Sequence, residues 1–448
     1  PEVFEKGGFD VVVGNPPYVP LEFFNENEKQ YFRSNFPVLE RKYDSSAIFI
    51  LKGLNLINST GILSYISSVT WQTGENYKNF RKVLFEKYGL LEIVNLPFDV
   101  FADAYVDTCI YFFSNYKTTK YRIFNFDKSD KVFDLSQLEF STIEIDKIAE
   151  PDYKIILTEK AYDLLDQIKQ RRDTISLGEI SISTQGLAGN RFNISDEEFE
   201  NSFPFLKNGQ GYRYWLKIKE VGFTSLDEYK SLKQFYEAKP KILIRRIISR
   251  QDRLLACFTD KRIVFTKDMN PFVIIDKEFK TKFVLSILNS SLISYLYLNF
   301  SSIATKDDSR QTTLSELRNL PIVKTTFEEQ GRYEAKVDFI CKKIIDFESV
   351  TTRFLSLLTA KYPSLQPTKK LESWPELTFA EFLKELKKQK IAWSLREESE
   401  WLEHFTQEQA AARVLRQEIA KTDREIDRKV YELDGLTEAE IALGEGRG

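Results

Sequence analysis

The sequence predicts an α/β protein with more than one domain, and three observations lead to that prediction. Its 448 residues exceed an ordinary single domain, and 42% of them are hydrophobic, which is enough for several cores. Up to about residue 150, short apolar runs alternate with stretches of helical periodicity, which indicates an open sheet with right-handed crossovers. From about residue 327 onward the pattern is helical. We therefore expect an α/β region first and a helical region last.

The first region contains strand and helix signals in close succession. Residues 11–13 are three valines, typical of a buried strand in a mostly parallel sheet, and Gly14 with the double proline ends that strand. A helix is expected over "SSAIFILKGLNLI", because its apolar residues recur at helical spacing. The following elements are a strand "ILSYISS", a helix from about Asn76 to Glu86, and the strands "LLEIVNL" and "DTCIYFFSN".

The rest of the chain divides into a second α/β block and a helical end. Charged sequence between about Phe124 and Asp152 marks a boundary, so we predict domains over residues 1–150, 151–325 and 326–448. In the middle block, which has short irregular elements, "KNGQGYRYW" (residues 207–215) is expected to be a loop and "KFVLSILNSSLISYLYL" an apolar helix. Near the end, apolar residues fall close to heptad spacing, which fits an amphipathic packing helix or a coiled coil equally. They are Leu415, Ile419, Ile426, Val430 and Leu433. Thr437 and Glu440 form a capping box that opens a short last helix.

The composition narrows the classes of function. Three widely separated cysteines predict neither a disulfide framework nor a metal site, and favour a reduced, cytoplasmic compartment. The single histidine, His404, lies in a charged helical stretch and is expected at the solvated surface, which argues against zinc and histidine-based hydrolases. The most apolar stretch, residues 283–300, is interrupted by Asn and Ser, so no membrane span is expected. A net charge of -3 means that any DNA contact must come from local patches.

The segment "GNPPY" after the first strand has the chemistry of an amino-group site. In open α/β sheets, ligands bind beyond the carboxyl ends of the strands, where this segment lies. The Asn15 side-chain oxygen and the Pro16 carbonyl are both acceptors, and Pro16 and Pro17 stiffen the backbone that holds them. Two rigid acceptors suit a planar amino group, whose nitrogen becomes more nucleophilic when both hydrogens are bound. Tyr18 offers a stacking face, although a plain strand-to-loop turn would also explain the two prolines.

This segment resembles the signature of amino-methyltransferases, which act on adenine or cytosine in DNA or on glutamine in release factors. "RKYDSSAIFILKGLNLI", "GILSYISSVTW" and "FDVFADAYVDTCIYFF" are similar to later segments of the TaqI-like adenine methyltransferases, with Ser68 where that family usually has proline. The resemblance implies a Rossmann-like methyltransferase sheet that uses S-adenosylmethionine and flips its target base. It also implies a site of Asn15, Pro16, Pro17, Tyr18 and Phe101, with Asn15 bordering the cofactor. Phe101 would stack opposite Tyr18, although a core position fits this phenylalanine equally.

The middle block holds the densest basic stretch, which is made up of Lys239, Lys241, Arg245, Arg246, Arg250 and Arg253. Arginine suits guanine and phosphate, so we expect Lys241, Arg245, Arg246 and Arg250 to contact double-stranded DNA. The alternative is solvated charge flanking a buried strand. Gln210 and Arg213, in the expected loop, are further candidates for base contact. "KPKILIRRI", "FVLSILNSSLISYLYLNF" and "LSELRNLPIV" resemble the target-recognition domain of TaqI-like and type IIG restriction–modification enzymes. The tail "EIDRKVYELDGLTEAEI" resembles the C-terminal helix of type IIG and type IIS enzymes.

The sequence departs from this family at one point. The family's glycine-rich donor-binding motif should precede "NPPY", and nothing of the form D-x-x-x-G-x-G precedes Asn15. We therefore expect the chain to be the C-terminal portion of a type IIG or IIS DNA adenine methyltransferase, with the donor half and any nuclease upstream. Alone it should bind S-adenosylmethionine weakly or not at all and be inactive. The alternatives are a non-catalytic DNA-specificity module and, less well supported, a protein-glutamine methyltransferase.

Overall fold

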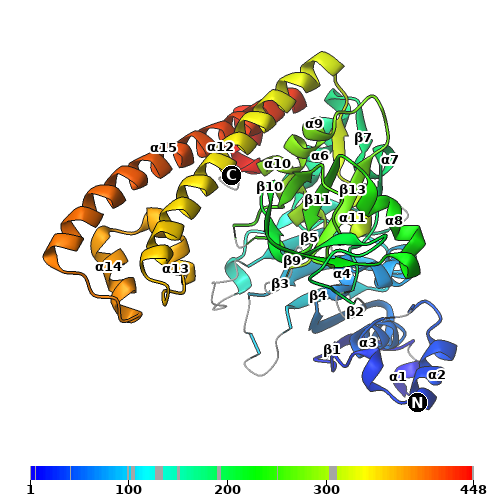
Figure 1. The fold of residues 1–448 in the computed structure, drawn as a ribbon. Helices are drawn as coiled ribbons and strands as arrows, with labels where there is room; N and C mark the ends of the chain where they lie inside the picture. The colour runs from blue at the N-terminus through cyan, green and yellow to red at the C-terminus, as the bar shows by residue number, and fades with distance from the viewer. Residues whose placement is uncertain are drawn as a thin grey trace. The chain divides into compact units, whose positions relative to one another are not determined.

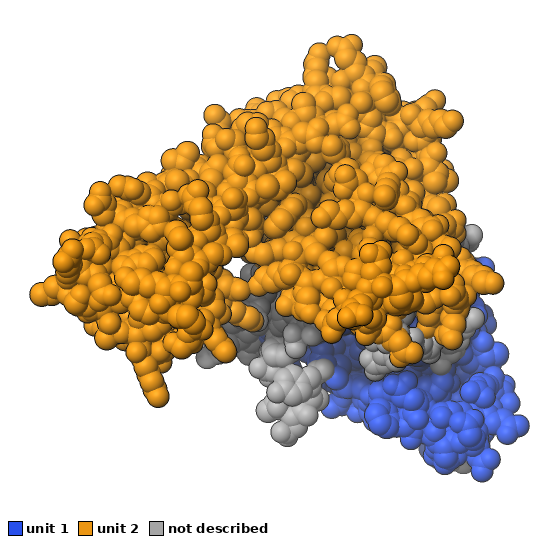
Figure 2. All heavy atoms as spheres, in the orientation of Figure 1, with its two compact units in different colours: residues 1–170, 295–312 blue, residues 171–294, 313–448 orange. Residues whose placement is uncertain are grey.

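The computed structural model describes residues 2–5, 7–40, 42–97, 100–101, 106–126, 135–148, 152–188, 193–249, 251–301 and 310–445. The chain forms two compact units (Figures 1 and 2). The first unit comprises residues 1–170 and 295–312, and the second comprises residues 171–294 and 313–448. The predicted α/β class is confirmed, because mixed sheets come first along the chain and long helices come last.

The first unit is built on a six-stranded mixed sheet with the order β1-β2-β4-β3-β5-β6. Its strands are β1 (Phe9–Gly14), β2 (Ile57–Ser68), β3 (Gly89–Asn95), β4 (Thr108–Ser114), β5 (Lys120–Asn125) and β6 (Ser141–Glu144). β1 is parallel to β2 and β3 is parallel to β5, whereas β4 is antiparallel to both of its neighbours and β6 is antiparallel to β5. Its helices are α1 (Glu2–Glu5), α2 (Glu26–Asn35), α3 (Ser45–Leu54), α4 (Thr70–Thr73) and α5 (Lys78–Lys87), and α6 (Glu159–Arg171) follows.

The opening strand differs from the prediction. Val11 and Val13 were expected to be buried, but their exposed fractions are 57% and 74%. Among the described residues β1 pairs only with β2, so it forms an edge of the sheet. A β-branched run predicts a strand but carries no information about how many neighbours that strand has.

The second unit contains another six-stranded sheet, with the order β8-β13-β11-β12-β10-β9. The strands of this unit are β7 (Thr174–Ser176), β8 (Ser181–Ser183), β9 (Phe203–Gly211), β10 (Tyr214–Thr224), β11 (Lys241–Arg245), β12 (Ala256–Thr259), β13 (Met269–Ile274) and β14 (Pro321–Val323). The isolated parallel bridge between Phe205 and Val264 connects β9 to the segment before β13. The helices of this unit are α7 (Leu177–Ile180), α8 (Lys230–Glu237), α9 (Thr281–Leu288) and α11 (Leu314–Arg318), while α10 (Ser291–Phe300) begins in this unit and ends in the first.

Two predicted elements of the middle block are wrong. Residues 207–215, expected as a loop, belong to the hairpin of β9 and β10, in which Gln210 pairs with Lys217. The apolar helix is two helices, α9 and α10, bent by 63°. The break follows from Asn289, whose side chain accepts from the Ala256 N–H at 3.0 Å and donates to the Ala256 carbonyl at 2.9 Å. In the described part of the chain no single helix is both long and apolar enough to cross a membrane, although this bent pair passes that test by length and composition.

The C-terminal part of the second unit is dominated by two long helices, α12 (Phe327–Lys361) and α15 (Leu395–Asp434), joined through α13 (Lys369–Glu372) and α14 (Phe379–Lys388) (Figure 1). α12 and α15 are antiparallel, because Lys336 pairs with Glu425 whereas Arg353, further along α12, pairs with Glu408. Ile426 and Val430 of the heptad pattern are buried. The predicted capping box opens α16 (Glu438–Gly444). Short 3-10 turns occupy Leu21–Phe23, Glu75–Tyr77, Leu135–Gln137, Ile145–Lys147, Asp227–Tyr229 and Trp374–Glu376.

The environment of His404 also corrects a prediction. Its ring is half-buried and stacks on Phe354, with ring centroids 5.5 Å apart, instead of lying in solvent. Phe354 stacks in turn on Trp374 at 4.0 Å. The charged residues around His404 in the sequence suggested an exposed position. The sequence does not show that Phe354, from α12, packs against the ring. The cysteines are free, and burial raises the pKa of Cys109 and Cys257 to about 12. No group of His, Cys, Asp and Glu suited to a metal ion occurs among the residues that are described.

Candidate active site and nucleic-acid interface

The predicted amino-group site is a short loop at the carboxyl end of β1. Asn15 is exposed, Pro16 is buried, Pro17 is exposed and Tyr18 is half-buried. The Tyr18 hydroxyl lies 2.7 Å from Asn15 Oδ1 and 3.0 Å from the carbonyl of Ile66 on β2, and it can donate its proton to either. The loop is therefore fastened to the carboxyl end of the adjacent strand. Burial raises the pKa of Tyr18 to about 12, and Cys109 and Asp44 add to this shift, so the hydroxyl keeps its proton at neutral pH.

A serine that the sequence did not single out holds this loop from the other side. Ser45, the first residue of α3, donates through its hydroxyl to the Pro17 carbonyl at 2.5 Å and accepts from the Val19 N–H at 3.1 Å. Its backbone N–H also donates to the Val19 carbonyl at 2.9 Å. Pro16 and Pro17 limit the backbone rotations and Ser45 fixes the carbonyl beside them, so the loop is held in one conformation.

Asp44, just before Ser45, completes this support. Its carboxylate accepts from the Ser46 N–H at 2.9 Å and so caps α3. It also accepts from the Tyr77 hydroxyl at 2.9 Å, which connects the cap to the turn before α5. An acidic residue before a helical run is an N-cap signal, so the sequence contained a clue to Asp44. It contained none to Ser45, whose partners follow from the fold.

The structure brings Phe101 to Tyr18, with ring centroids 6.5 Å apart and an interplanar angle of 69°. The rings meet edge to face, so this arrangement is not the parallel one that stacking on both faces of a base requires. Phe101 is half-buried. Its position beside Tyr18 agrees with the expected pairing of these two rings, and its role in binding a base stays a prediction.

The predicted DNA contact at Lys241 is corrected by the structure. The side chain is fully buried, and its ammonium donates to the carbonyls of Tyr236, Ala238 and Lys261 at 2.8, 3.0 and 2.8 Å. Burial lowers the pKa of Lys241 to about 8. All three donors are bound by backbone, so Lys241 stabilises the start of β11 and has no proton left for a phosphate.

Arg213 is corrected for a similar reason. Its guanidinium makes a bidentate pair with Asp423 on α15, at 2.6 and 2.7 Å, and also donates to the Asn289 carbonyl at 2.7 Å. Only 21% of the side chain is exposed. The guanidinium therefore connects the turn of the β9–β10 hairpin to the long C-terminal helix. A bidentate pair with a carboxylate is a strong, well-oriented hydrogen-bonding arrangement for arginine.

Arg253, from the same basic stretch, extends this buried cluster. It donates to the same Asn289 carbonyl at 2.7 Å and lies 3.5 Å from Asp427, one turn after Asp423 on α15. Burial raises the pKa of Asp427, and Arg253 and Arg213 oppose that shift. Two arginines and two aspartates thus fasten the hairpin and the α9–α10 break to α15.

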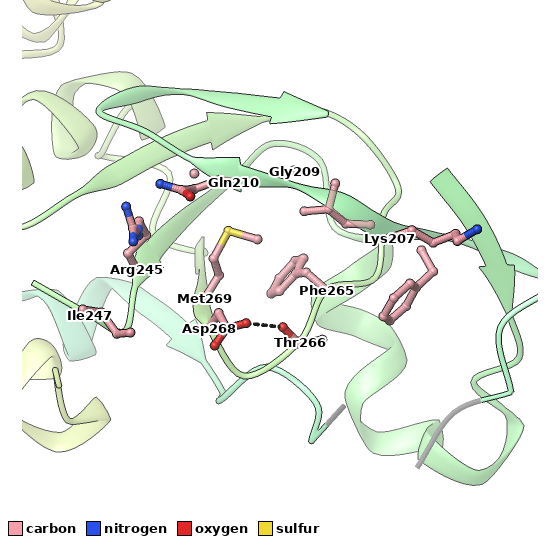
Figure 3. Close-up of a pocket in the computed structure, with 12 residues that line it drawn as sticks. Lys207, Gly209, Gln210, Arg245, Ile247, Phe265, Thr266, Asp268 and Met269 are labelled. Carbon is pink, nitrogen blue, oxygen red and sulfur yellow. Dashed lines mark hydrogen bonds between the residues drawn. The ribbon is translucent and has the colours of Figure 1, made fainter. Parts of the chain in front are cut away.

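The remaining basic candidates lie elsewhere in the second unit. Gln210 on β9 is exposed and Arg245 at the end of β11 is half-exposed, and both line one pocket of about 330 Å³ (Figure 3). Arg246 is half-exposed and does not line that pocket. Arg250 lies outside the described residues. Gln210 and Arg245 therefore line one pocket, and Lys241 and Arg213 do not line it.

Comparisons with known proteins identify the parts that carry these two sites. Residues 1–101 match the Eco57I restriction-modification methylase family, and residues 198–322 match the TaqI-like C-terminal specificity domain. Residues 326–430 match a domain of unknown function, DUF8810. The chain therefore joins a segment that matches the Eco57I-type restriction-modification methylases to a segment that matches the TaqI-like specificity domain.

The chain is similar in sequence to two relatives and in fold to one solved structure. A Methanocaldococcus jannaschii protein named as a type II restriction enzyme and methyltransferase is 37% identical over 335 residues, which are 72% of this chain and 28% of that protein. The Escherichia coli type II restriction enzyme and methyltransferase RM.Eco57I is 28% identical over 108 residues, 23% of this chain and 11% of that one. The matched part of the chain thus spans less than a third of the length of these relatives. The type IIL restriction-modification enzyme MmeI, solved in complex with DNA, has a similar fold, with a TM-score of 0.54, 13% identity, and coverage of 97% of this chain and 56% of that one.

Proposed function

We propose that the chain is the target-base and specificity portion of a site-specific DNA adenine methyltransferase in a restriction–modification enzyme. It binds double-stranded DNA, and its NPPY loop receives the flipped adenine. The observation that carries the proposal is this loop at the carboxyl end of β1, where Tyr18 and Ser45 immobilise it. The match of residues 198–322 to a specificity domain supports DNA over a protein-glutamine substrate. We retain residues 1–150, 151–325 and 326–448 as the proposed functional division.

The proposed chemistry belongs to the loop itself. The Asn15 oxygen and the Pro16 carbonyl accept the two hydrogens of the adenine amino group, which leaves its nitrogen lone pair available for reaction. The Tyr18 hydroxyl donates to Asn15 Oδ1, so the carboxamide presents an acceptor in a fixed direction. Tyr18 offers an aromatic face that offsets the stacking lost on flipping, roughly 1–3 kcal/mol per base, and Phe101 has to turn from its edge-to-face position to offer a second one.

The residues present do not fit a complete site for S-adenosylmethionine. Asn15 borders the expected cofactor position, but no glycine-rich motif precedes it in the sequence. The unpaired edge of β1, with exposed Val11 and Val13, supports the proposal that further strands of the same polypeptide complete the sheet and supply the donor site. We expect calorimetric titration of this chain with S-adenosylmethionine to give no measurable binding. A micromolar Kd would contradict that expectation.

The catalytic assignment is tested by Asn15→Ala in a longer protein that includes the upstream half. Methyl transfer to DNA should be abolished, because one of two acceptors is removed, while DNA affinity stays within about twofold, since Asn15 makes no phosphate contact in this proposal. Asn58→Ala, at the opposite end of the neighbouring strand β2, is the matched control and should keep full transfer. Unchanged turnover in Asn15→Ala would reject the assignment.

A second candidate function is a DNA-specificity module without catalysis, which the match of residues 198–322 to a TaqI-like specificity domain favours. If the longer protein transfers no methyl group to any duplex, yet this chain selects one sequence from random duplexes, the specificity module is the better description. The same selection on the wild-type chain also tests whether residues 198–322 act as a specificity domain here.

A further inference from the structure

The segment between the long helices α12 and α15 has a basic surface. Residues 363–393 contain six lysines, four glutamates and no arginine or aspartate, whereas the whole chain has a net charge of -3. The segment includes α13 and α14, which lie at one end of the long helix pair (Figure 1), and it falls within the match to the domain of unknown function. Five exposed lysines on these two short helices are called the lysine patch below. They are Lys369, Lys370, Lys384, Lys387 and Lys388.

The periodicity of α14 gathers three of these lysines on one side. Lys384, Lys387 and Lys388 are three and four residues apart, so they share one face of the helix. Phe382 and Leu386, which are 0% and 1% exposed, pack into the aromatic core of the segment. The face of α14 that turns away from this core is therefore basic.

A buried carboxylate brings a lysine of α13 to the same place. The side chain of Glu385 is 6% exposed, and its Oε1 accepts from Lys388 Nζ at 2.7 Å and lies 3.6 Å from Lys370 Nζ. The two lysine side chains are still 59% and 54% exposed. An ammonium group has three donors, so each of them keeps donors for a further acceptor. Lysines from two helices thus converge on one carboxylate.

The glutamates of this segment do not neutralise the rest of the patch, because each one already has partners. These partners are Lys219 for Glu372, Arg416 for Glu376, the Thr378 N–H and hydroxyl for Glu381, and Lys370 with Lys388 for Glu385. In the part of the chain that the structure describes, the ammonium groups of Lys369 and Lys387 make no hydrogen bond or ion pair. The patch therefore presents a local excess of positive charge to solvent.

The neighbouring β9–β10 hairpin, in contrast, has its own charges paired. Its basic residues are Lys207, which pairs with Asp196 and Glu220, Arg213 with Asp423, Lys217 with Glu348, and Lys219 with Glu372. The pair of Lys219 and Glu372, at 2.9 Å, joins β10 to the last residue of α13. Because α13 has only four residues, this contact holds the lysine patch beside the hairpin of the segment that matches the specificity domain.

The chemistry that fits this surface is a row of phosphates. Lysine binds phosphate as a point charge, and each strand of a duplex carries one phosphate per ~3.4 Å of helix axis. Lys384 and Lys388 are about 6 Å apart along α14, so the patch can contact more than one phosphate. We propose that the lysine patch binds the phosphate backbone of the duplex that residues 198–322 recognise. The contact is independent of sequence and positions the duplex on the hairpin. This inference rests on the proposed DNA-recognition function.

The test is the double variant Lys384→Gln with Lys387→Gln, which leaves Glu385 and its two partners intact. Binding of the chain to its selected duplex is measured by fluorescence anisotropy at several salt concentrations. At about 50 mM salt the Kd should rise roughly 10-fold, and the slope of log Kd against log salt should fall by about 1.8, since two phosphate contacts are lost. The base preference in a random-pool selection should stay that of wild type.

The matched control is Lys277→Gln with Lys342→Gln, which removes the same charge from two exposed lysines outside the patch. Its Kd and salt slope should stay close to those of wild type, and the thermal midpoints of both double variants should be unchanged. Single methylphosphonate linkages, which remove the charge of one phosphate, locate the contact. Some linkages should weaken wild-type binding and leave the binding of Lys384→Gln with Lys387→Gln unaffected.

Three outcomes would overturn the proposal. Equal salt slopes of the patch variant and the control would mean that the patch does not bind phosphates, although DNA recognition by the chain would stand. An altered base preference in the patch variant would mean that these lysines contact bases instead. If the wild-type chain binds no duplex, the proposed recognition function fails and this inference with it.

Discussion

Ser45 ties Pro17 of the NPPY loop and Val19 just after it to the start of α3, and its removal should affect chemistry more than stability. Ser45→Ala deletes the bonds to the Pro17 carbonyl and the Val19 N–H, so the loop can shift. In the longer protein we expect kcat for methyl transfer to fall by about 10-fold or more, because small misplacements of reacting groups are costly. The KM for DNA and the thermal midpoint should change little. Ser46→Ala, whose hydroxyl faces Asp44 instead, is the control, and an unchanged kcat in Ser45→Ala would show that the loop holds itself.

Asp434 makes stability depend on pH. The carboxyl is 5% exposed and lies at the C-terminal end of α15, and burial raises its pKa from 3.8 to about 7 while Arg172 opposes the shift. The folded state therefore holds this proton more tightly than the unfolded state. The resulting stability is fully present below about pH 4 and is lost as the pH rises through about 7.

Asp434→Asn removes the ionisable group, so the variant does not lose this stability as the pH rises. At pH 8 the variant should have a higher free energy of unfolding than wild type, by roughly 1–4 kcal/mol, and the difference should vanish as the pH approaches 4. Glu403→Gln, on the exposed side of the same helix, should show no such trend. Parallel denaturant curves from pH 4 to 8 measure both variants, and a constant difference across that range would contradict the assignment.

Residue by residue, the NPPY loop could be predicted because its chemistry is local. Asn15, Pro16, Pro17 and Tyr18 are consecutive, and the end of β1 places them. The assignment of Arg213 failed because its partner is not local, and that of Lys241 failed because the sequence does not show that its ammonium is buried against backbone carbonyls. The carboxylate that binds Arg213 is 210 residues away, and charge density along the sequence does not show whether a cation is already paired inside the fold.

At the scale of elements, the β9–β10 hairpin and α15 should behave as one packed structure. Arg213 and Asp423 pair where little water reaches them, and Tyr214 also donates to Asp423 at 2.9 Å. Removing one partner leaves the other charge buried, so Asp423→Ala should lower the free energy of unfolding by roughly 3–5 kcal/mol.

The double variant Arg213→Met with Asp423→Leu should be more stable than the sum of the two single changes predicts. A double-mutant cycle in denaturant should give a coupling energy of at least about 1.5 kcal/mol. Additive effects would mean that solvent satisfies these side chains. The exposed pair of Arg396 and Glu400 on the same helix is the comparison, and its coupling should stay below about 0.5 kcal/mol.

The predicted elements were reliable where a periodic pattern was long and unreliable where one side chain decided the outcome. Ten residues of helical spacing gave α3, and the heptad pattern gave α15, a helix of 40 residues. The α9–α10 break depends on Asn289, whose side chain bonds to the backbone N–H and carbonyl of Ala256 as a neighbouring strand would. The apolar content of this stretch of sequence does not reveal that contact. The hairpin was missed because its polar residues look like a loop until they are paired.

At the scale of the whole molecule, the edge of β1 should control how this chain behaves in solution. Its exposed valines and unpaired backbone groups are a template for strand pairing with another copy. We expect the isolated chain to self-associate, and Val11→Lys to reduce that association by placing a charge on the edge. Val414→Lys on α15 changes a side chain of equal exposure, 57%, away from the edge. Sedimentation velocity at several concentrations should show the reduction only for Val11→Lys, and equal behaviour of the two variants would exclude this edge as the contact.

The path of the chain limits how specificity could be transplanted between relatives. Residues 295–312 belong to the first unit although they divide the second unit into two segments. The second unit is also closed on itself, because Arg171 at its start pairs with Glu440 near its end at 3.0 Å. A chimera with a single crossover near residue 171 would keep the pair of Arg171 and Glu440. It would also replace residues 295–312, which belong to the unit that contains the methylase segment, together with the specificity domain. Exchanging specificity cleanly therefore calls for three junctions, which restore residues 295–312 to their original sequence.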